Sequence, residues 1–162
     1  MGAKLINTAL GRLEILKNYK NIAIVGLSSN PYRPSHFAAI YLLSEGYNVI
    51  PINPKETEIL GRKCYPSVTV AAAELGRAYI EVVDVFRNSK DVPPIADEAI
   101  AIGARVLWLQ LGVINEEAAL KAINGGLDVV MDRCMKIEHA RFFGGLNLIG
   151  LNTGVISAKR DL

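Results

Sequence analysis

Short apolar runs alternate with longer stretches of helical periodicity along the chain. Leucine, isoleucine and alanine residues between Leu5 and Leu16 recur at helical spacing, which predicts an N-terminal helix within residues 1–20. The later apolar runs are rich in valine and isoleucine and are bounded by turn-forming residues, as is typical of buried strands. Five strands are predicted in this way, over residues 21–26, 47–52, 79–86, 105–109 and 127–131.

The segments between these strands predict helices. Ser35 is a candidate N-cap for a helix that extends to about residue 45 and is ended by Gly46. Further helices are predicted around residues 70–75, over 92–102 with two prolines in its first turn, and over 115–123 with Asn115 as cap. This regular alternation predicts an α/β fold, in which a mainly parallel sheet is covered by helices on both faces within one domain over residues 1–162.

Composition narrows the class of protein. The chain is 51% hydrophobic and 21% charged, as globular proteins are, and its net charge of +2 does not indicate a nucleic-acid partner. Two cysteines form no disulfide framework and fit a reducing compartment. No uncharged stretch has the length of a membrane span, and the charged first 20 residues lack a signal-peptide core. We therefore expect a cytoplasmic protein that binds neither nucleic acid nor membrane.

Ligands of open parallel sheets bind beyond the carboxyl ends of the strands, so the loops that follow the strands are informative. The first loop leads to a helix N-terminus, where free N–H groups and the helix dipole favour a phosphate. Its candidate ligand contacts are Gly26, Ser28, Ser29, Arg33 and Ser35, which offer close backbone approach, hydroxyl groups and a guanidinium. Two glycines of the dinucleotide-binding motif are missing, so an ordinary turn with a solvated arginine is the alternative.

The second and third loops carry cations. A site for NAD places an acidic residue at the end of the second strand, but this chain has Asn53, Pro54 and Lys55 there. A lysine suits a phosphorylated ribose, and a solvated turn is the alternative. In the third loop Arg87 follows Phe86, which either lies against an adenine or covers the end of the sheet.

The fourth and fifth loops contain one amide and one cysteine of interest. Gln110 interrupts an apolar run, so it is either hydrogen-bonded within the protein or faces a ligand, and Gly112 lets the backbone come close. Cys134 stands between Arg133 and Lys136; nearby cations favour a reactive thiolate, and a buried inert cysteine is the alternative. No nucleophile elbow, Walker A lysine or metal-ligand spacing occurs, so we predict neither catalytic residues nor a metal site.

Six segments in these loops resemble the small stand-alone CoA-binding proteins, whose domain also forms the N-terminal part of the succinyl-CoA synthetase α subunit. The matching segments extend from about residue 20 to 141. They are Gly26-Leu27-Ser28 with Arg33-Pro34-Ser35, residues 51–55, 61–67, 83–87 and 108–112, and residues 131–134 with Lys136, Glu138 and His139.

The resemblance implies a Rossmann-like fold that holds CoA or an acyl-CoA across the strand ends. In this interpretation the first loop binds the pyrophosphate through Arg33, and residues 53–55 lie near the adenosine 3′-phosphate. The remaining implied contacts are Phe86, Arg87 and Val92 along the adenine or pantetheine path, and Gln110 and Gly112 beside the pantetheine. Arg33, Lys55, Arg87 and Arg133 are expected to cluster at this end of the sheet.

Four functions remain open at this point. The first is binding of CoA or an acyl-CoA without chemistry of its own. The others are a redox role through a mixed disulfide between CoA and Cys134 or Cys64, a subunit of a split acyl-CoA synthetase, and an NAD(P)-binding protein. Residues 142–162 are too apolar for a solvated tail, so we expect them to pack on this domain or to form a homo-oligomer contact.

Overall fold

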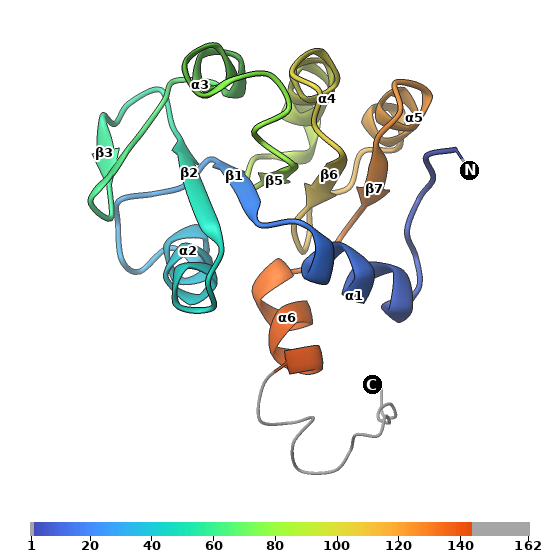
Figure 1. Cartoon of the computed structure of the whole chain (residues 1–162), viewed down its shortest axis with the longest axis horizontal. Helices are drawn as coiled ribbons and strands as arrows, with labels where there is room; N and C mark the ends of the chain where they lie inside the picture. The colour runs from blue at the N-terminus through green and yellow to red at the C-terminus, as the bar shows by residue number, and fades with distance from the viewer. Residues whose placement is uncertain (1, 144–162) are drawn as a thin grey trace.

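The computed structural model describes residues 2–143, and its centre is one parallel sheet of five strands (Figure 1). The strand order is β2-β1-β5-β6-β7. The strands are β1 (Asn21–Val25), β2 (Asn48–Ile52), β5 (Val82–Val85), β6 (Val106–Leu109) and β7 (Asp128–Val130). Each lies within one of the runs predicted from the sequence. The predicted strands and the Rossmann-like α/β fold are therefore confirmed.

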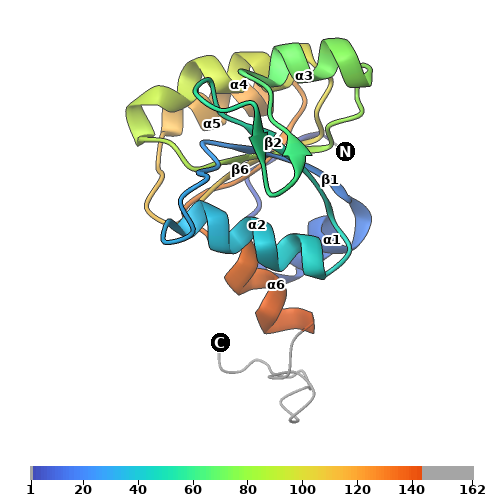
Figure 2. The same cartoon turned by 90° about the vertical axis from the view of Figure 1, so that its left-hand side faces the viewer.

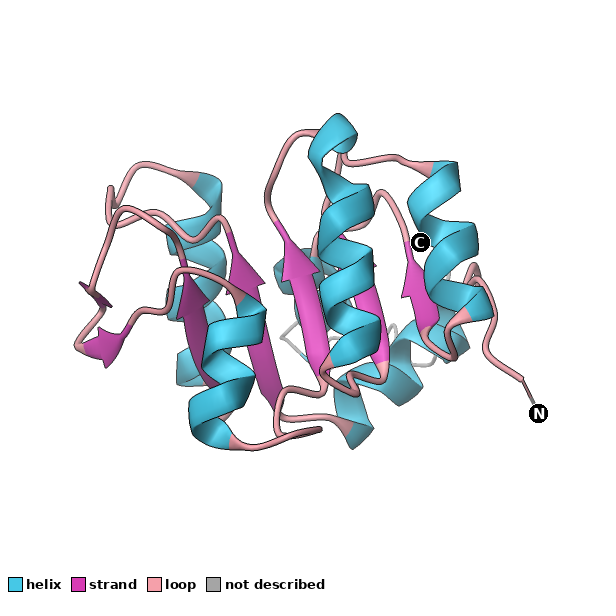
Figure 3. Ribbon diagram, turned by 90° about the horizontal axis from the view of Figure 1, so that it is seen from above, coloured by secondary structure: helices cyan, strands magenta, loops and turns pink. Residues whose placement is uncertain are grey.

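Helices cover both faces of the sheet (Figure 2). One face carries α3 (Val68–Leu75), α4 (Val92–Ala101) and α5 (Glu116–Asn124), and the other carries α1 (Ala9–Asn18), α2 (Pro34–Ser44) and α6 (Met135–Phe143). A short 3-10 turn, η1 (Ser89–Asp91), leads into α4. Seen from above, the strands of the sheet point the same way between the two helical layers (Figure 3). No helix among residues 2–143 combines the length and the apolarity needed to cross a membrane.

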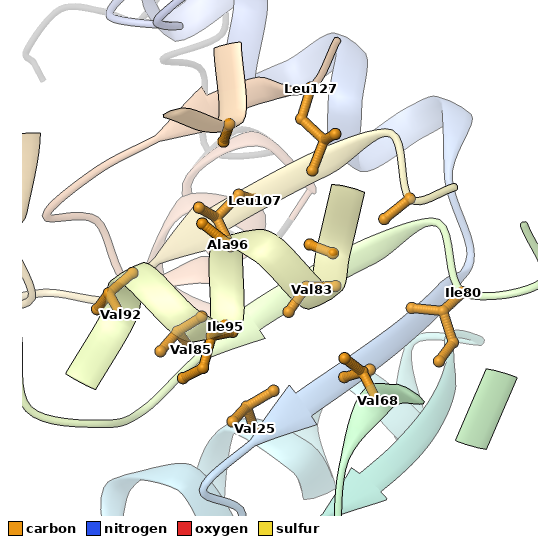
Figure 4. Packing of buried hydrophobic residues seen from close by; sticks show 14 of the residues in the cluster. Val25, Val68, Ile80, Val83, Val85, Val92, Ile95, Ala96, Leu107 and Leu127 are labelled. Carbon is orange, nitrogen blue, oxygen red and sulfur yellow. The ribbon is translucent and has the colours of Figure 1, made fainter. Parts of the chain in front are cut away.

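Both faces of the sheet are buried, which explains the continuous apolar runs. On the α3–α5 side, strand residues such as Val83 and Val85 pack with Ile95 and Ala96 of α4 (Figure 4). On the α1, α2 and α6 side, a second cluster is built around Trp108, which is fully buried. Apolar side chains on both sides of the strands therefore hold the three layers together.

Two predicted helix starts are corrected by the structure. The first helix begins at Ala9, because Leu5 is extended and forms a parallel bridge with Val129 of β7. The second helix begins at Pro34, whose fixed φ and missing N–H suit the first helical position. Ser35 therefore lies inside the helix, and its hydroxyl accepts from a loop amide instead of capping.

Two elements were not predicted. The first is a hairpin of two-residue strands, β3 (Glu58–Ile59) and β4 (Arg62–Lys63), too short to give a periodic pattern. The second is α6, which buries Glu138 and His139 while Ile137 is 45% exposed. Although Met135 is also buried, polar side chains on the buried face and an apolar one on the exposed face depart from an ordinary amphipathic helix, so the hydrophobic pattern does not reveal α6.

Candidate functional site

Strand order reverses between β1 and β5, and two adjoining cavities lie at the carboxyl ends of the strands there. The loop after β1 leads to α2 on one face, and the loop after β5 leads through η1 to α4 on the other. Such a switch point is where ligands of open α/β sheets bind. The cavities have volumes of about 510 Å³ and about 550 Å³ and share Pro34, Phe86 and Arg87 in their walls.

The two cavities differ in chemistry and are named accordingly. The basic cavity is lined by Gly26, Ser28, Arg33, Pro34, Ser35, Asn53, Pro54, Lys55, Phe86 and Arg87. The apolar cavity is lined by Pro34, Phe86, Arg87, Asn88, Gln110, Leu111, Val113, Cys134 and Ile137. The structure thus brings together most of the residues singled out in the sequence. It adds Asn88, Leu111, Val113 and Ile137, whose apolar or neutral side chains gave no signal of a site.

Gly26 is required where the first loop leaves the sheet. Its φ of +87° is unfavourable for any residue with a side chain, and its N–H donates to Ile52 O at 2.9 Å. A Cβ at this position would overlap the carbonyl oxygen of Phe86 and lie 2.9 Å from Arg87 Cδ. The absence of a side chain therefore lets the loops after β1 and β5 approach each other beneath the basic cavity.

The first turn of α2 fixes the conformation of this loop. The Ser28 N–H donates to Ser35 Oγ at 3.0 Å, and His36 Nδ1 donates to Ser28 O at 2.8 Å. Ser35 and His36 are both buried. Sequence reasoning missed His36, because a lone histidine carries no signal that it binds a backbone carbonyl eight residues earlier.

Three cations surround the basic cavity. Arg33 and Lys55 are exposed, and no carboxylate of residues 2–143 lies within salt-bridge distance of either. Arg87 Nη2 has a loose contact of 3.8 Å with Asp91 Oδ2. This arrangement leaves a positive field over the mouth of the cavity, which attracts anions.

Asn53 shapes the second loop with its side chain. Its Nδ2 donates to Leu27 O at 2.9 Å, and its Oδ1 accepts from the Lys55 N–H at 2.8 Å. Both ends of the amide are therefore engaged within the protein. Asn53 joins the first two loops and directs the turn that presents Lys55.

A buried carboxyl lies behind the apolar cavity. Asp84 on β5 is fully buried, and its Oδ1 accepts a hydrogen bond from Nε2 of the buried Gln110. Burial raises the pKa of Asp84 to about 7, although the Gln110 hydrogen bond works in the opposite direction. Sequence reasoning did not single out Asp84, but an aspartate inside the run Val82–Val85 was a signal that could have identified it.

The two cysteines have different environments. Cys134 is partly exposed, lines the apolar cavity and directly precedes α6. Cys64 is buried, its thiol donates to Asn53 O at 3.5 Å, and burial raises the pKa of that thiol. Of the two, only Cys134 lines a cavity at the strand ends. Within residues 2–143 no cluster of three metal-ligating side chains occurs.

Four predicted contacts line neither cavity. Val92 is fully buried in the core beneath α4, because its position in the first helical turn faces the sheet. Ser29 Oγ donates to Glu56 Oε2 at 2.9 Å, and the Gly112 N–H donates to Asp132 Oδ1 at 2.7 Å. Val92, Ser29 and Gly112 therefore pack against or bond other parts of the protein, although the sequence suggested them as ligand contacts.

Arg133, the fourth of these residues, borders a separate cavity of about 220 Å³ near α1. Only three of the four expected cations therefore surround the basic cavity. The backbone of Arg133 is held in place, since its N–H donates to Leu109 O at 3.2 Å and its carbonyl accepts from Trp108 Nε1 at 2.8 Å. The sequence gives the charge of a loop residue but not the side of the loop on which it lies. Residues 142–162 were expected to pack on this domain or to form a homo-oligomer contact, and residues 144–162 of that segment lie outside the described residues.

Comparison with known proteins identifies several relatives. The sequence matches the CoA binding domain family over residues 20–140. It is 40% identical over 127 residues to Uncharacterized protein YneT of Bacillus subtilis (strain 168), covering 78% of this chain and 90% of that protein. A solved hypothetical protein from Pyrococcus horikoshii OT3 is 45% identical with a TM-score of 0.79, covering 85% of this chain and 94% of the other.

A more distant structural relative is part of a larger enzyme. The dinucleotide forming acetyl-coenzyme A synthetase 1 of Ca. Korarchaeum cryptofilum, in its apo form, is 27% identical with a TM-score of 0.61. The match covers 74% of this chain and 28% of the synthetase chain. The fold described here is therefore similar to one portion of that enzyme.

Proposed function

Because the chain belongs to the CoA binding domain family, which its residues 20–140 match, we propose that it binds coenzyme A or an acyl-CoA across the two adjoining cavities. The observation that carries this proposal is the change in chemistry from one cavity to the next. CoA has three phosphates towards one end and a long, weakly polar pantetheine arm at the other. A basic cavity joined to an apolar one is complementary to such a molecule.

In the proposed complex the diphosphate lies against the first loop and Arg33, at the N-terminal end of α2. Lys55 contacts the 3′-phosphate, and Phe86 at the shared wall lies against the adenine or the start of the arm. The pantetheine arm then extends between Leu111 and Ile137 towards Cys134. The positive side chains would then contact the phosphates of CoA, and the apolar side chains would contact its pantetheine arm.

The proposal is one of binding without catalysis. Neither histidine of the chain lines the two cavities, since His36 bonds Ser28 O and His139 Nδ1 lies 2.9 Å from the Tyr41 hydroxyl. No histidine, aspartate or glutamate that could act as a general base is found among the residues that line the two cavities. A protein of this kind would carry, store or sense CoA.

Calorimetric titration at low salt with CoA, dephospho-CoA and NADP⁺ tests this proposal. We expect CoA to bind more tightly than NADP⁺, and R33A to weaken both CoA and dephospho-CoA by roughly tenfold, the effect of one charge-assisted hydrogen bond. K55A should weaken CoA but leave dephospho-CoA unaffected, because only CoA has the 3′-phosphate. K17A, on the exposed face of α1, removes an equal charge far from the cavities and is the control. Tighter binding of NADP⁺ than of CoA would overturn the proposal in favour of an NAD(P)-binding protein.

A second candidate function is a redox role, which the position of Cys134 favours. Its thiol lies in the wall of the cavity proposed for the pantetheine arm, whereas Cys64 is buried elsewhere. Exchange with a disulfide of CoA would form a Cys134–CoA disulfide and release the other thiol of that disulfide. Mass spectrometry after incubation with oxidised CoA should show one CoA adduct that is lost on reduction. The adduct should disappear in C134S and persist in C64S; an adduct that persists in C134S would exclude this role.

A third candidate is a subunit of a split acyl-CoA synthetase, which the similarity to part of the Korarchaeum enzyme favours. In that case a partner protein would have to supply the remaining catalytic parts. Purification under native conditions should then recover a second polypeptide in stoichiometric amount. Recovery of this chain alone, with CoA bound, would favour the binding function.

A further inference from the structure

Asp84 and Gln110 form an isolated polar pair inside an apolar layer. Asp84 lies on the central strand of the sheet, opposite Ile24 of β1 and Trp108 of β6. Its side chain points to the α1, α2 and α6 side, since its neighbours Val83 and Val85 face the opposite cluster. Gln110 is 3% exposed and follows β6 directly, at the wall of the apolar cavity.

The hydrogen bonds of this pair are incomplete if Asp84 is ionised. Gln110 Nε2 donates to Asp84 Oδ1, but Asp84 Oδ2 and Gln110 Oε1 are both buried without a hydrogen-bond partner among residues 2–143. A carboxylate oxygen and an amide oxygen are both acceptors, so neither can satisfy the other. Buried polar atoms normally have a hydrogen-bond partner. It therefore needs an explanation that these two side chains bond each other and still leave one buried acceptor each unpaired.

One proton on Asp84 Oδ2 would give both of these oxygens a hydrogen-bond partner. A protonated Oδ2 is a donor, and the free acceptor of the same pair is Gln110 Oε1. The carboxylic acid and the amide then form two parallel hydrogen bonds, one in each direction. The same arrangement removes a negative charge from a fully buried position, where it is costly.

We propose that Asp84 is a neutral carboxylic acid in the folded protein and that it positions the Gln110 amide at the wall of the apolar cavity through two parallel hydrogen bonds. Asp84 thereby acts as a positioning residue for the pantetheine arm, a role that rests on the proposed function. Ionisation breaks one of the two bonds and leaves a buried charge behind the cavity. Occupation of the cavity is therefore linked to retention of a proton by Asp84.

Within residues 2–143 the surroundings of Asp84 offer no counter-charge. The other titratable side chains buried on this side of the sheet are Arg12, His36, Tyr47, Cys64, Glu138 and His139. Arg12 Nε and Glu138 Oε1 neutralise each other at 2.7 Å, and His36 and His139 are bonded to Ser28 and Tyr41. The raised pKa of Asp84 has burial as its main cause, and none of these groups contributes to it. The titration thus belongs to the acid–amide pair alone.

The first test uses the free protein and so does not depend on CoA. Infrared spectroscopy of the wild type should show the carbonyl band of a buried protonated carboxyl at pH 6, which disappears in D84N and fades as the pH rises above 7. Unfolding experiments should show wild-type stability falling, relative to D84N, between about pH 4 and about pH 7. The sign follows from the raised pKa: the folded state holds a proton that the unfolded chain has already released. The inference would be overturned if the infrared band is absent and the difference in unfolding free energy between wild type and D84N does not change with pH.

The second test measures the positioning role through ligand affinity. D84L, which removes both hydrogen bonds, should weaken dephospho-CoA binding by about tenfold at pH 6, and D84N, which reproduces both bonds, should restore it. At pH values above the pKa of Asp84, the wild type should lose affinity for dephospho-CoA while D84N does not. The ratio of the D84N affinity to the wild-type affinity should therefore rise by up to about tenfold per pH unit. A constant ratio of the two affinities from pH 6 to pH 9 would refute the role. Failure of the wild type to bind any CoA would instead count against the proposed function, and the infrared band would still decide the protonation state.

Discussion

Replacement of Gly26 by alanine should damage both the fold and the basic cavity. The new Cβ would overlap Phe86 O and lie 3.1 Å from the Phe86 carbonyl carbon, in a backbone conformation with φ of +87°. The conformational cost of a side chain there is about 1–2 kcal/mol. The overlap involves backbone, which cannot rotate away as a side chain does, so displacement of the loop after β5 should at least double the cost. We expect a total of about 2–4 kcal/mol, towards the upper end of the usual range for single substitutions.

Gly46 provides a matched control for this variant. Its φ is +92°, nearly the same as that of Gly26, but it lies at the end of α2 and a Cβ there would meet no atom within 4 Å. G46A should therefore cost only the conformational part, about 1–2 kcal/mol. The difference between the two variants isolates the close approach of the loops after β1 and β5.

Urea unfolding monitored by circular dichroism measures both free energies, and titration with CoA measures the effect on binding. G26A should bind CoA at least tenfold more weakly, because Phe86 and Arg87 move with the displaced loop, while G46A should bind as the wild type does. Equal destabilisation of the two variants, or wild-type affinity for CoA in G26A, would show that Gly26 and the Phe86 backbone are not in close contact.

Three further predictions concern contacts around the cavities. R12M should destabilise the protein by about 3–5 kcal/mol, because the buried Glu138 carboxylate loses its partner at 2.7 Å and keeps only a contact of 3.6 Å with Arg141. Adding E138L should recover most of that loss in urea unfolding. S35A should cost about 1–3 kcal/mol in the same assay, because a part-buried amide of the first loop loses its acceptor. Peptide mapping after alkylation should show Cys134 modified before the buried Cys64, and CoA should slow the modification of Cys134; preferential modification of Cys64 would contradict the described burial.

The strands and the location of the cavities follow from information that is local in the sequence. A strand buried on both faces favours a continuous apolar run, so residues 22–25 and Val106–Leu109 are recognisable from composition alone. Their parallel arrangement then requires that the loops after them meet at one edge. This is why residues as distant in sequence as Arg33 and Arg87 were predicted to share a site, and they line the same cavity.

The roles of individual polar residues depend on partners that are distant in sequence. Asn53 carries the right chemistry for a ligand contact, yet Leu27 O and the Lys55 N–H engage both ends of its amide. Arg133 has the expected charge but borders another cavity. Composition supplies the donors and acceptors near a site, whereas the three-dimensional fold decides which of them are already used within the protein.

Trp108 gives the molecule an internal optical reporter. It is the only tryptophan of the chain, its ring is fully buried, and its Nε1 donates to Arg133 O immediately before Cys134. Indole emission responds to the polarity and hydrogen bonding around the ring, so it should sense any displacement of the loop that leads into α6. Filling of the apolar cavity can therefore be followed in the unlabelled protein by its own fluorescence, and stopped-flow mixing would time that event without an attached dye.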